Sequence, residues 1–256
     1  MFGTMKKPRT IVAIGGGYIR KASTLPIDQE IVRLAGKKHP KLLFIPTASS
    51  DSVRYQDYAY RYFGKRLGCK VDLLLLLQSP PSPTEIRRKI LSADIIYVGG
   101  GNTLMMMKLW RRLGVDALLR QAWKRGTVLS GISAGSICWF ASGHSDSMSF
   151  YNPKRWKYIN VRGLGLIKGI HCPHFDGQTL RVPRKKHFER MIGKMGGTGI
   201  AIDNDCAIAF VDDRFRVLSS KKRAGAYRVF KRKGKVVTER ILEEQALKPI
   251  AMLLKK

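Results

Sequence analysis

The order of apolar and polar positions predicts alternating strands and helices in the first half of the chain. Near-continuous apolar runs alternate there with amphipathic stretches of helical spacing. Such runs are typical of parallel strands that are covered on both faces, with helices as the crossover connections. The predicted strands are residues 10–18, 41–49, 70–77, 93–101 and 127–133, and the predicted helices are residues 27–37, 52–67, 83–92 and 102–124.

The pattern changes in the second half of the chain. Residues 142–163 are polar and aromatic without a clear period, which predicts a long loop. A strand is expected at residues 163–173 and a basic helix near residues 179–195. Short strands follow, and the last two form a hairpin turned by Lys233-Gly234.

These elements predict one fold class. A chain of 256 residues that is 44% hydrophobic can bury a full core, and no internal repeat or low-complexity linker divides it. We therefore predict a single α/β domain over residues 1–256. Its sheet is expected to be mostly parallel, with helices on both faces and a C-terminal β-hairpin. Sites in such sheets lie at the carboxyl ends of strands.

The net charge of the chain suggests a possible class of partner but does not change the predicted fold. The 48 Lys and Arg residues against 18 Asp and Glu residues give a formal net charge of +30, so nonspecific association with polyanions is expected. The basic residues are spread along the chain, without zinc-finger spacing or an aromatic RNA-binding signature, which favours a solvated basic exterior over a nucleic-acid site.

The cysteines and the hydropathy of the chain indicate its cellular compartment. The four cysteines show no C-x-x-C spacing, which indicates neither a zinc site nor a disulfide framework and fits a reducing compartment. No stretch reaches the ~20 uncharged apolar residues of a membrane span. We expect a cytoplasmic protein without membrane contact, as a monomer or a homodimer.

The first candidate for chemistry is the pentapeptide GISAG, Gly131 to Gly135. It matches G-x-S-x-G, in which the glycines allow a sharp turn and the serine is presented as a nucleophile. An apolar strand precedes it and a predicted helix begins after it, which is the context this turn requires. The alternative is a Gly/Ser loop without catalytic function. We interpret Ser133 as the nucleophile.

A serine nucleophile needs a base, and the chain has five histidines. His171 and His174 share the stretch GIHCPHFDG at the end of a predicted strand. Residues an odd number apart on a strand point to opposite faces, so only one of them should face Ser133. Pro173 ends the strand and places His174 in the following loop, which favours His174 as the base. His171 is then a buried or rim histidine bonded to backbone.

Four motifs together carry a family resemblance. YVGGGNT at residues 97–103, GISAGS at 131–136, CPHFD at 172–176 and GIAIDND at 199–205 occur in an order and at spacings that resemble peptidase family S51. That family includes aspartyl dipeptidase (peptidase E) and cyanophycinase. The resemblance implies an α/β fold related to class I glutamine amidotransferases, with a serine nucleophile in place of cysteine.

The resemblance also implies roles for individual residues. Ser133 corresponds to the nucleophile and His174 to the general base. The backbone N–H groups of Gly100 and Ala134 correspond to the oxyanion hole, which stabilises the charge on the attacked carbonyl.

The residue that orients the base has several candidates. Family members carry one acidic residue after the nucleophile helix and another in the stretch that matches AIDND. The first corresponds to Asp146, our first choice, and the second to Asp203, because a buried acid fixes the histidine tautomer in a triad. One alignment puts Asn204 at the second position, where an uncharged group would stabilise the imidazolium less well.

The function implied is that of a serine peptidase without cofactor or metal, acting on a small peptide. In the dipeptidase branch an arginine recognises an N-terminal aspartate, and Arg181 and Arg184 are candidates, with Arg190 a third. None clearly occupies the family position, so strict Asp-X specificity is not predicted. Two alternatives stand beside this hypothesis: a cyanophycinase-like isopeptide hydrolase, and a polyanion-binding or nucleic-acid-binding protein that kept the fold and lost the activity.

Overall fold

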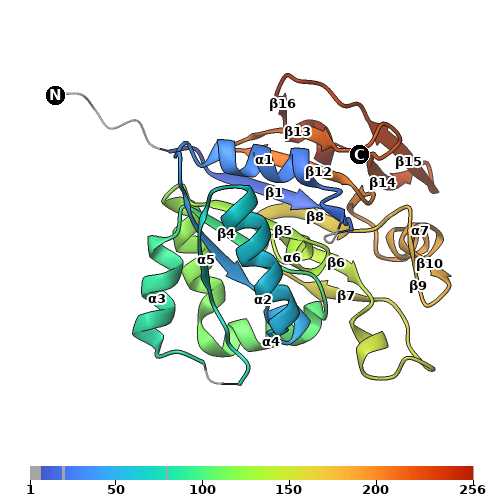
Figure 1. The fold of residues 1–256 in the computed structure, drawn as a ribbon. Helices are drawn as coiled ribbons and strands as arrows, with labels where there is room; N and C mark the ends of the chain where they lie inside the picture. The colour runs from blue at the N-terminus through green and yellow to red at the C-terminus, as the bar shows by residue number, and fades with distance from the viewer. Residues whose placement is uncertain (1–6, 19–20, 79, 256) are drawn as a thin grey trace.

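The computed structural model describes residues 7–18, 21–78 and 80–255, and shows a mixed α/β fold with two large sheets (Figure 1). The first sheet has eight strands. In order across the sheet they are β16 (Lys248–Pro249), β13 (Arg214–Ser219), β12 (Cys206–Val211), β1 (Thr10–Ile14), β5 (Val128–Ile132), β4 (Ile95–Val98), β2 (Lys41–Ile45) and β3 (Lys70–Leu73).

The second sheet has six strands and comes entirely from the second half of the chain. In order they are β15 (Lys235–Ile241), β14 (Ala226–Arg232), β11 (Thr198–Ile202), β8 (Ile167–Cys172), β6 (Phe140–Ser145) and β7 (Ile159–Arg162). Two short strands, β9 (Gln178–Thr179) and β10 (Val182–Pro183), pair with each other beside it.

The prediction of one mostly parallel sheet is corrected by this topology. The strands from β1 through β5, β4 and β2 to β3 are parallel, as predicted, but β12, β13 and β16 add to β1 in antiparallel fashion. The second sheet is parallel only where β8 meets β11 and β6. Hairpin connections account for two of the antiparallel pairs, β12–β13 and β14–β15, because consecutive strands joined by a tight turn must run antiparallel. The pairs β1–β12 and β13–β16 join strands that are distant in the sequence. The relation to class I glutamine amidotransferases stays a prediction, as does the single domain over residues 1–256.

The C-terminal hairpin is confirmed. β14 and β15 pair in antiparallel register from Ala226–Ile241 to Arg232–Lys235. The two turn residues, Lys233 and Gly234, have φ angles of 48° and 80°. Positive φ at both central positions is the geometry that lets a two-residue loop follow the twist of its strands.

The helices of the first half lie close to their predicted positions. Gly114, with φ of 70°, divides the predicted helix 102–124 into two. The helices are α1 (Leu25–Leu34), α2 (Val53–Ala59) continuing into the π-helix η3 (Tyr60–Arg66), α3 (Pro83–Ser92), α4 (Thr103–Leu113), α5 (Val115–Lys124), α6 (Ala134–Ile137), α7 (Arg184–Met195) and α8 (Ala251–Leu254), with short 3-10 turns η2 (Thr47–Ser49) and η4 (Ser147–Phe150).

The buried apolar side chains place these elements in layers. One cluster packs α1, α2 and η3 against one face of the first sheet, for example Ile31 and Phe63 against Phe44. A second cluster fills the opposite face, where α3, α4, α5 and the second sheet lie. A third packs Phe188 and Ile192 of α7 on the outer face of the second sheet. Helices on both faces of the first sheet are therefore confirmed.

The expected long loop at residues 142–163 is wrong in part. Its ends are the strands β6 and β7, which pair with each other, so only the segment between them, which contains η4, is irregular. The four cysteines are buried and free. Within the described ranges, no helix has the length and apolar character to cross a membrane, and no cluster of three or more His, Cys, Asp or Glu residues is suited to a metal ion.

Candidate active site

Ser133 lies on a tight turn between β5 and α6. Its backbone angles are φ 57° and ψ −115°, a conformation that costs free energy for a residue with a side chain. The two neighbouring glycines have no room for a side chain: a Cβ at Gly131 would lie 2.3 Å from the Gly135 oxygen, and one at Gly135 would lie 2.1 Å from the Val98 oxygen. The spacing G-x-S-x-G is therefore a steric requirement of this turn.

The end of β1 holds the serine and a histidine together. The Ser133 N–H donates to the Ile14 oxygen at 3.1 Å, and the His174 N–H donates to the Gly15 oxygen at 3.1 Å. Residues separated by 41 positions in the sequence are thus anchored on two consecutive peptide units. The position of β1 between β5 and β12 makes this possible, because it ends beside both the serine turn and the loop after β8.

The ring of His174 is oriented by Asn204. His174 Nδ1 lies 2.6 Å from Asn204 Oδ1. The amide nitrogen Nδ2 of Asn204 donates to Asp176 Oδ1 at 2.9 Å, and the Asn204 backbone N–H donates to the same oxygen at 2.8 Å. Because the amide oxygen can only accept, His174 Nδ1 carries the proton and Nε2 is left as the acceptor. This is the tautomer that a general base requires.

The electrostatic surroundings keep His174 neutral. Burial lowers the pKa of the His174 ring, and the nearby Arg184 guanidinium lowers the pKa further. The hydrogen bond to Asn204 and the charges of Asp146 and Asp176 act in the opposite direction. A neutral imidazole with its Nε2 lone pair free can accept a proton.

Asp146 and Asp203, the two acids expected to orient the base, have other partners. Asp146 Oδ2 accepts from Arg184 Nη2 at 2.5 Å and from the Thr179 hydroxyl at 2.9 Å. Asp203 Oδ2 accepts from the Gly225 N–H and from the Tyr227 hydroxyl, each at 3.0 Å. In the described part of the chain neither acid is a hydrogen-bond partner of His174, and Asn204, the alternative left open by the sequence, contacts the ring instead.

Burial also changes the protonation of Asp203. It raises the pKa of this carboxyl to about 6, and the charge of Asp176 adds to that effect. Asp203 lies at the end of β11, where its side chain turns toward β14. Asp203 and Asn204 are neighbours in the sequence. For that reason the motif alone did not decide which of them corresponds to the family position.

His171 is buried and serves the structure of the turn. Its Nδ1 lies 2.8 Å from the Ile200 oxygen and its Nε2 lies 2.8 Å from the Ser136 hydroxyl. Burial lowers the pKa of this ring to about 3, so the ring is neutral. Its Nδ1–H donates to the Ile200 oxygen, and its Nε2 accepts a hydrogen bond from the Ser136 hydroxyl. The ring stacks on Phe140 with centroids 4.4 Å apart. His171 lies in β8, whereas His174 lies in the loop after it with a φ of 49°, so the two rings have different surroundings.

The segment after β4 lies against the serine. A Cβ at Gly100 would lie 3.2 Å from Ser133 Cβ and 3.7 Å from Ser133 Oγ. The Tyr55 ring covers this segment, because a Cβ at Gly99 would lie 2.7 Å from Tyr55 Cε1. Ala134, the first residue of α6, follows the serine directly and is buried. The two backbone positions expected to form an oxyanion hole therefore both adjoin Ser133.

A hollow of about 530 Å³ opens beside His174. Arg184, at the start of α7, is 3% exposed and contributes to its wall, whereas Arg181 is exposed in the turn between β9 and β10. Within the described residues, Nε and Nη1 of Arg184 are buried without a hydrogen-bond partner. The lining residues are Gly17, Tyr18, Asp146, His174, Asp176, Gly177, Gln178, Thr179, Arg184 and Asn204.

Comparison with known proteins identifies the family. The family model described as Peptidase family S51 matches residues 11–218. The chain belongs to peptidase family S51. It is 37% identical over 223 residues to the uncharacterized peptidase YgaJ of Bacillus subtilis strain 168, covering 86% of this chain and 92% of that protein. It is 28% identical over 155 residues to Peptidase E of Nostoc sp. strain PCC 7120, covering 59% of each.

Solved structures of peptidases share the fold. A peptidase from an acI-B1 Actinobacterium superposes with a TM-score of 0.68 at 18% identity, covering 95% of this chain and 98% of that one. A putative Peptidase E protein from Listeria monocytogenes EGD-e gives a TM-score of 0.61 at 20% identity, covering 83% and 98%. The S51 family match makes the protein a peptidase, and these structures extend the likeness to its three-dimensional fold.

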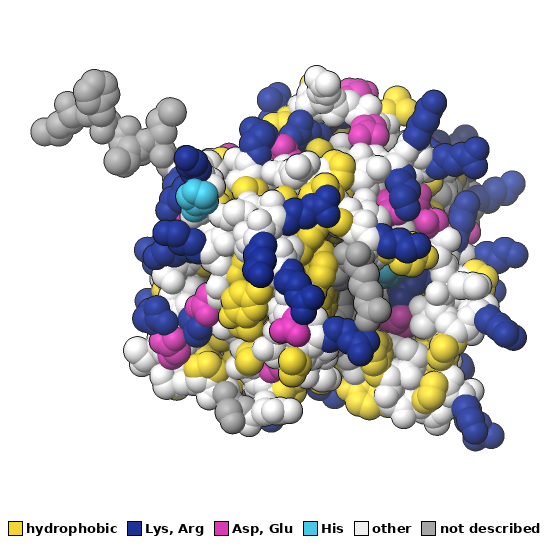
Figure 2. All heavy atoms as spheres, in the orientation of Figure 1, with side chains coloured by type: hydrophobic (Ala, Val, Ile, Leu, Met, Phe, Trp, Pro, Cys, Tyr) yellow, Lys and Arg dark blue, Asp and Glu magenta, His cyan; other side chains and the backbone are white. Residues whose placement is uncertain are grey.

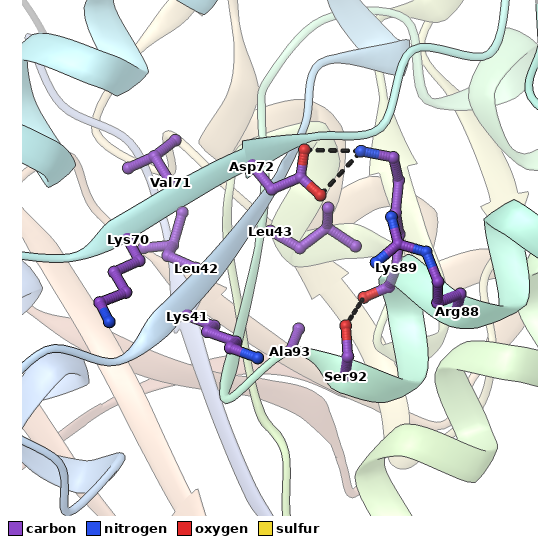
Figure 3. Close-up of a pocket in the computed structure, with 10 residues that line it drawn as sticks. All are labelled: Lys41, Leu42, Leu43, Lys70, Val71, Asp72, Arg88, Lys89, Ser92 and Ala93. Carbon is purple, nitrogen blue, oxygen red and sulfur yellow. Dashed lines mark hydrogen bonds and ion pairs between the residues drawn. The ribbon is translucent and has the colours of Figure 1, made fainter.

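A second hollow lies at the opposite end of the parallel strands from Ser133. It measures about 290 Å³, and Figure 3 shows its lining. Lys41 and Lys70 stand at the amino ends of β2 and β3, whereas Ser133 follows the carboxyl end of the parallel strand β5. Its main polar contact is already satisfied, since Lys89 Nζ lies 2.6 and 2.7 Å from the two Asp72 oxygens. We do not assign chemistry to this hollow.

Sequence reasoning missed Asp176 and Gly16. Asp176 lies in the S51 motif CPHFD, only two residues after His174, and that proximity was the available signal. Gly16 belongs to the run Gly15–Gly17, and the sequence does not show which of these glycines lies against the site. A Cβ at Gly16 would lie 2.2 Å from both Asn204 Oδ1 and His174 Nδ1, a contact that only the folded chain reveals.

Proposed function

We propose that the protein is a serine-type peptidase that hydrolyses short peptides through an acyl-enzyme. The observation that carries the proposal is the strained backbone of Ser133, with φ of 57° on a turn whose two glycines leave no space for side chains. Strain of this kind clusters at active sites, and together with the two glycines it supports the proposal that this turn is a nucleophile elbow.

The side chains suggest the course of the reaction. Ser133 Oγ attacks the substrate carbonyl carbon while its proton passes to His174 Nε2. The N–H groups of Gly100 and Ala134 stabilise the negative oxygen that forms. The imidazolium then gives its proton to the leaving amine, and the C–N bond breaks. Water attacks the acyl group with His174 again as base, which releases the carboxylic acid and restores Ser133.

Asn204 takes the place that a carboxylate holds in a Ser-His-Asp triad. It fixes the ring and the tautomer of His174 through the 2.6 Å hydrogen bond. A neutral amide stabilises the imidazolium less than a carboxylate does. The negative charges that act on His174 come instead from Asp146 and Asp176, which raise its pKa from nearby.

The hollow beside His174 supports a small substrate. Its volume of about 530 Å³ falls within the range of about 300–1,000 Å³ that is usual for sites of small ligands. We propose Arg184 as a substrate contact, because its Nε and Nη1 donors are buried and have no acceptor among the described residues. Arg181 is exposed on a turn, so its contact with a substrate would be weaker.

The proposal is tested by labelling and hydrolysis together. A fluorophosphonate probe should label the protein stoichiometrically, and a dipeptide library should contain hydrolysed members. Ser133→Ala should abolish both, while Ser149→Ala, in η4, should change neither. A library of β-aspartyl isopeptides run in parallel separates peptide from isopeptide hydrolysis.

A negative result would favour the polyanion-binding alternative. Lys and Arg side chains are spread over the face shown in Figure 2. Retention on heparin and DNA columns should therefore be measured against salt in the same study. Tight DNA binding at high salt, with Ser133 unreactive toward the probe, would contradict the peptidase proposal.

A further inference from the structure

Asp176 holds both nitrogen atoms of Asn204 with a single carboxylate oxygen. Its Oδ1 accepts from the Asn204 backbone N–H at 2.8 Å and from the side-chain Nδ2 at 2.9 Å. The two bonds fix the main chain and the side chain of the same residue. Asp176 is itself only two residues from His174, and the Gly177 N–H donates to the His174 oxygen at 2.8 Å, which closes the turn.

An asparagine amide has two ends of nearly equal shape and opposite hydrogen-bonding character. If Oδ1 faces His174, the ring holds its proton on Nδ1 and Nε2 is an acceptor. If Nδ2 faces His174, the ring must accept at Nδ1 and carry its proton on Nε2, where it cannot receive the Ser133 proton. The orientation of one amide group therefore decides whether His174 is a base.

Gly16, after the end of β1, lies closely against this amide and the His174 ring. A Cβ at Gly16 would lie 2.2 Å from Asn204 Oδ1, 2.2 Å from His174 Nδ1 and 2.3 Å from His174 Cε1, so the β1 end covers both groups closely. Gly16 and Asn204 also form a parallel bridge between their backbones. A 180° flip of the amide would exchange its oxygen and nitrogen without changing its shape, and the bond from Nδ2 to Asp176 opposes that flip.

We propose that Asp176 is a positioning residue for the peptidase reaction, which fixes the Asn204 amide and through it the Nδ1–H tautomer of His174. This rests on the proposed function only for its effect on rate. The tautomer itself is a property of the resting protein. Asp176 also contributes its charge, which raises the pKa of His174 against the effect of burial.

The first test removes the acceptor. Asp176→Ala should lower kcat by roughly 10- to 100-fold, with little change in KM. This loss of kcat is smaller than the ~10⁴-fold loss expected when the wrong tautomer is fixed completely, because the free amide still samples both orientations. Asp176→Asn keeps an oxygen acceptor and should cost less. Both variants should shift the acidic limb of the rate profile to lower pH. Asp213→Ala, an exposed aspartate in the β12–β13 turn, is the matched control and should change nothing.

The second test restores a fixed acceptor by another route. In the double variant Asp176→Ala/Asn204→Asp, a carboxylate accepts the Nδ1 proton through either oxygen and needs no orienting partner. Its kcat should exceed that of Asp176→Ala. A purely structural role of Asp176 predicts no such rescue, since the second substitution restores neither of the hydrogen bonds that Asp176 accepts from Asn204.

The third test reads the tautomer without turnover. Imidazole ¹⁵N chemical shifts, assigned with His174→Gln, should show a proton on Nδ1 of His174 in the unmodified protein and a mixture of tautomers in Asp176→Ala. The same Nδ1–H tautomer in both, or a wild-type kcat in Asp176→Ala, would overturn the proposal. Failure of the peptidase proposal looks different: Ser133 would not react with the probe, while the ¹⁵N result would still decide the role of Asp176.

Discussion

Arg184 and Asp146 form an ion pair in which Nη2 lies 2.5 Å from Oδ2. The Arg184 side chain is 4% exposed and that of Asp146 is 20% exposed, so the pair is largely removed from water. It joins the first residue of α7 to the residue after β6, and both side chains line the hollow beside His174. Asp146 thus neutralises an arginine, and it acts on His174 through its charge.

Removing Asp146 should leave a buried cation without its partner. Asp146→Ala is expected to lower the free energy of unfolding by about 3 kcal/mol, measured by urea unfolding at pH 7.5. Since Asp146 raises the pKa of His174, the acidic limb of the rate profile should also move to lower pH.

Two variants make this result specific. Asp146→Ala/Arg184→Met removes both charges and should recover much of the lost stability. Glu85→Ala removes the partner of the exposed Arg88 and should leave the stability nearly unchanged. If Asp146→Ala is as stable as the parent protein, the buried ion pair has no structural role.

His174 should control the pH dependence of turnover. Burial lowers the pKa of this ring, so the neutral form persists below the ordinary value of 6.5 and the acidic limb should fall below pH 6.5. His174→Gln should reduce turnover by roughly 10⁶-fold, as loss of the base does in serine protease triads. His171→Gln should retain most of it, because His171 contacts Ser136 and Ile200 instead. An active His174→Gln with an inactive His171→Gln would reverse the assignment.

His171 should make the protein less stable in acid. Its pKa is about 3 in the folded protein, against 6.5 for an unperturbed histidine. Between these pH values the unfolded chain binds a proton that the folded chain does not. Proton binding by the unfolded chain therefore lowers the free energy of unfolding as the pH falls below 6.5, by about 1.4 kcal/mol per pH unit. Above pH 6.5 both states are neutral at this residue, and it causes no loss of stability. Urea unfolding at pH 7.5 and 5.5 should show a smaller loss in His171→Gln than in the parent. Equal losses would contradict the assignment.

The serine turn should not tolerate a methyl group at its second glycine. A Cβ at Gly135 would lie 2.1 Å from the Val98 oxygen, so Gly135→Ala should cost about 1–3 kcal/mol or more and abolish probe labelling of Ser133. Gly64→Ala is the control, because a Cβ there meets neighbours only at 3.7 and 3.9 Å within a helical segment. That change should be neutral or stabilising by about 0.5–1 kcal/mol. A stable, labelled Gly135→Ala protein would show that the turn can relax.

Local patterns in the sequence predicted the parts of the fold that depend on neighbouring residues. Apolar runs and amphipathic stretches predicted β1 to β5 and the helices between them, because strand and helix periods are properties of consecutive side chains. The turn around Ser133 was predictable for the same reason: Gly131 and Gly135 satisfy a steric need that arises within five residues. The pairing of strands was not, since β12 reaches β1 across nearly the whole chain.

The candidate site divides in the same way. The sequence by itself determined the glycine-flanked turn of Ser133 and the loop that carries His174, and four motifs indicated the family. Only the tertiary structure decided which side chain contacts the His174 ring. Asp146, Asp203 and Asn204 were all candidates from the sequence, and hydrogen bonding depends on direction and on distances of about 3 Å. Folding turns Asp146 toward Arg184 and Asp203 toward Tyr227, and leaves Asn204, held by Asp176, facing His174.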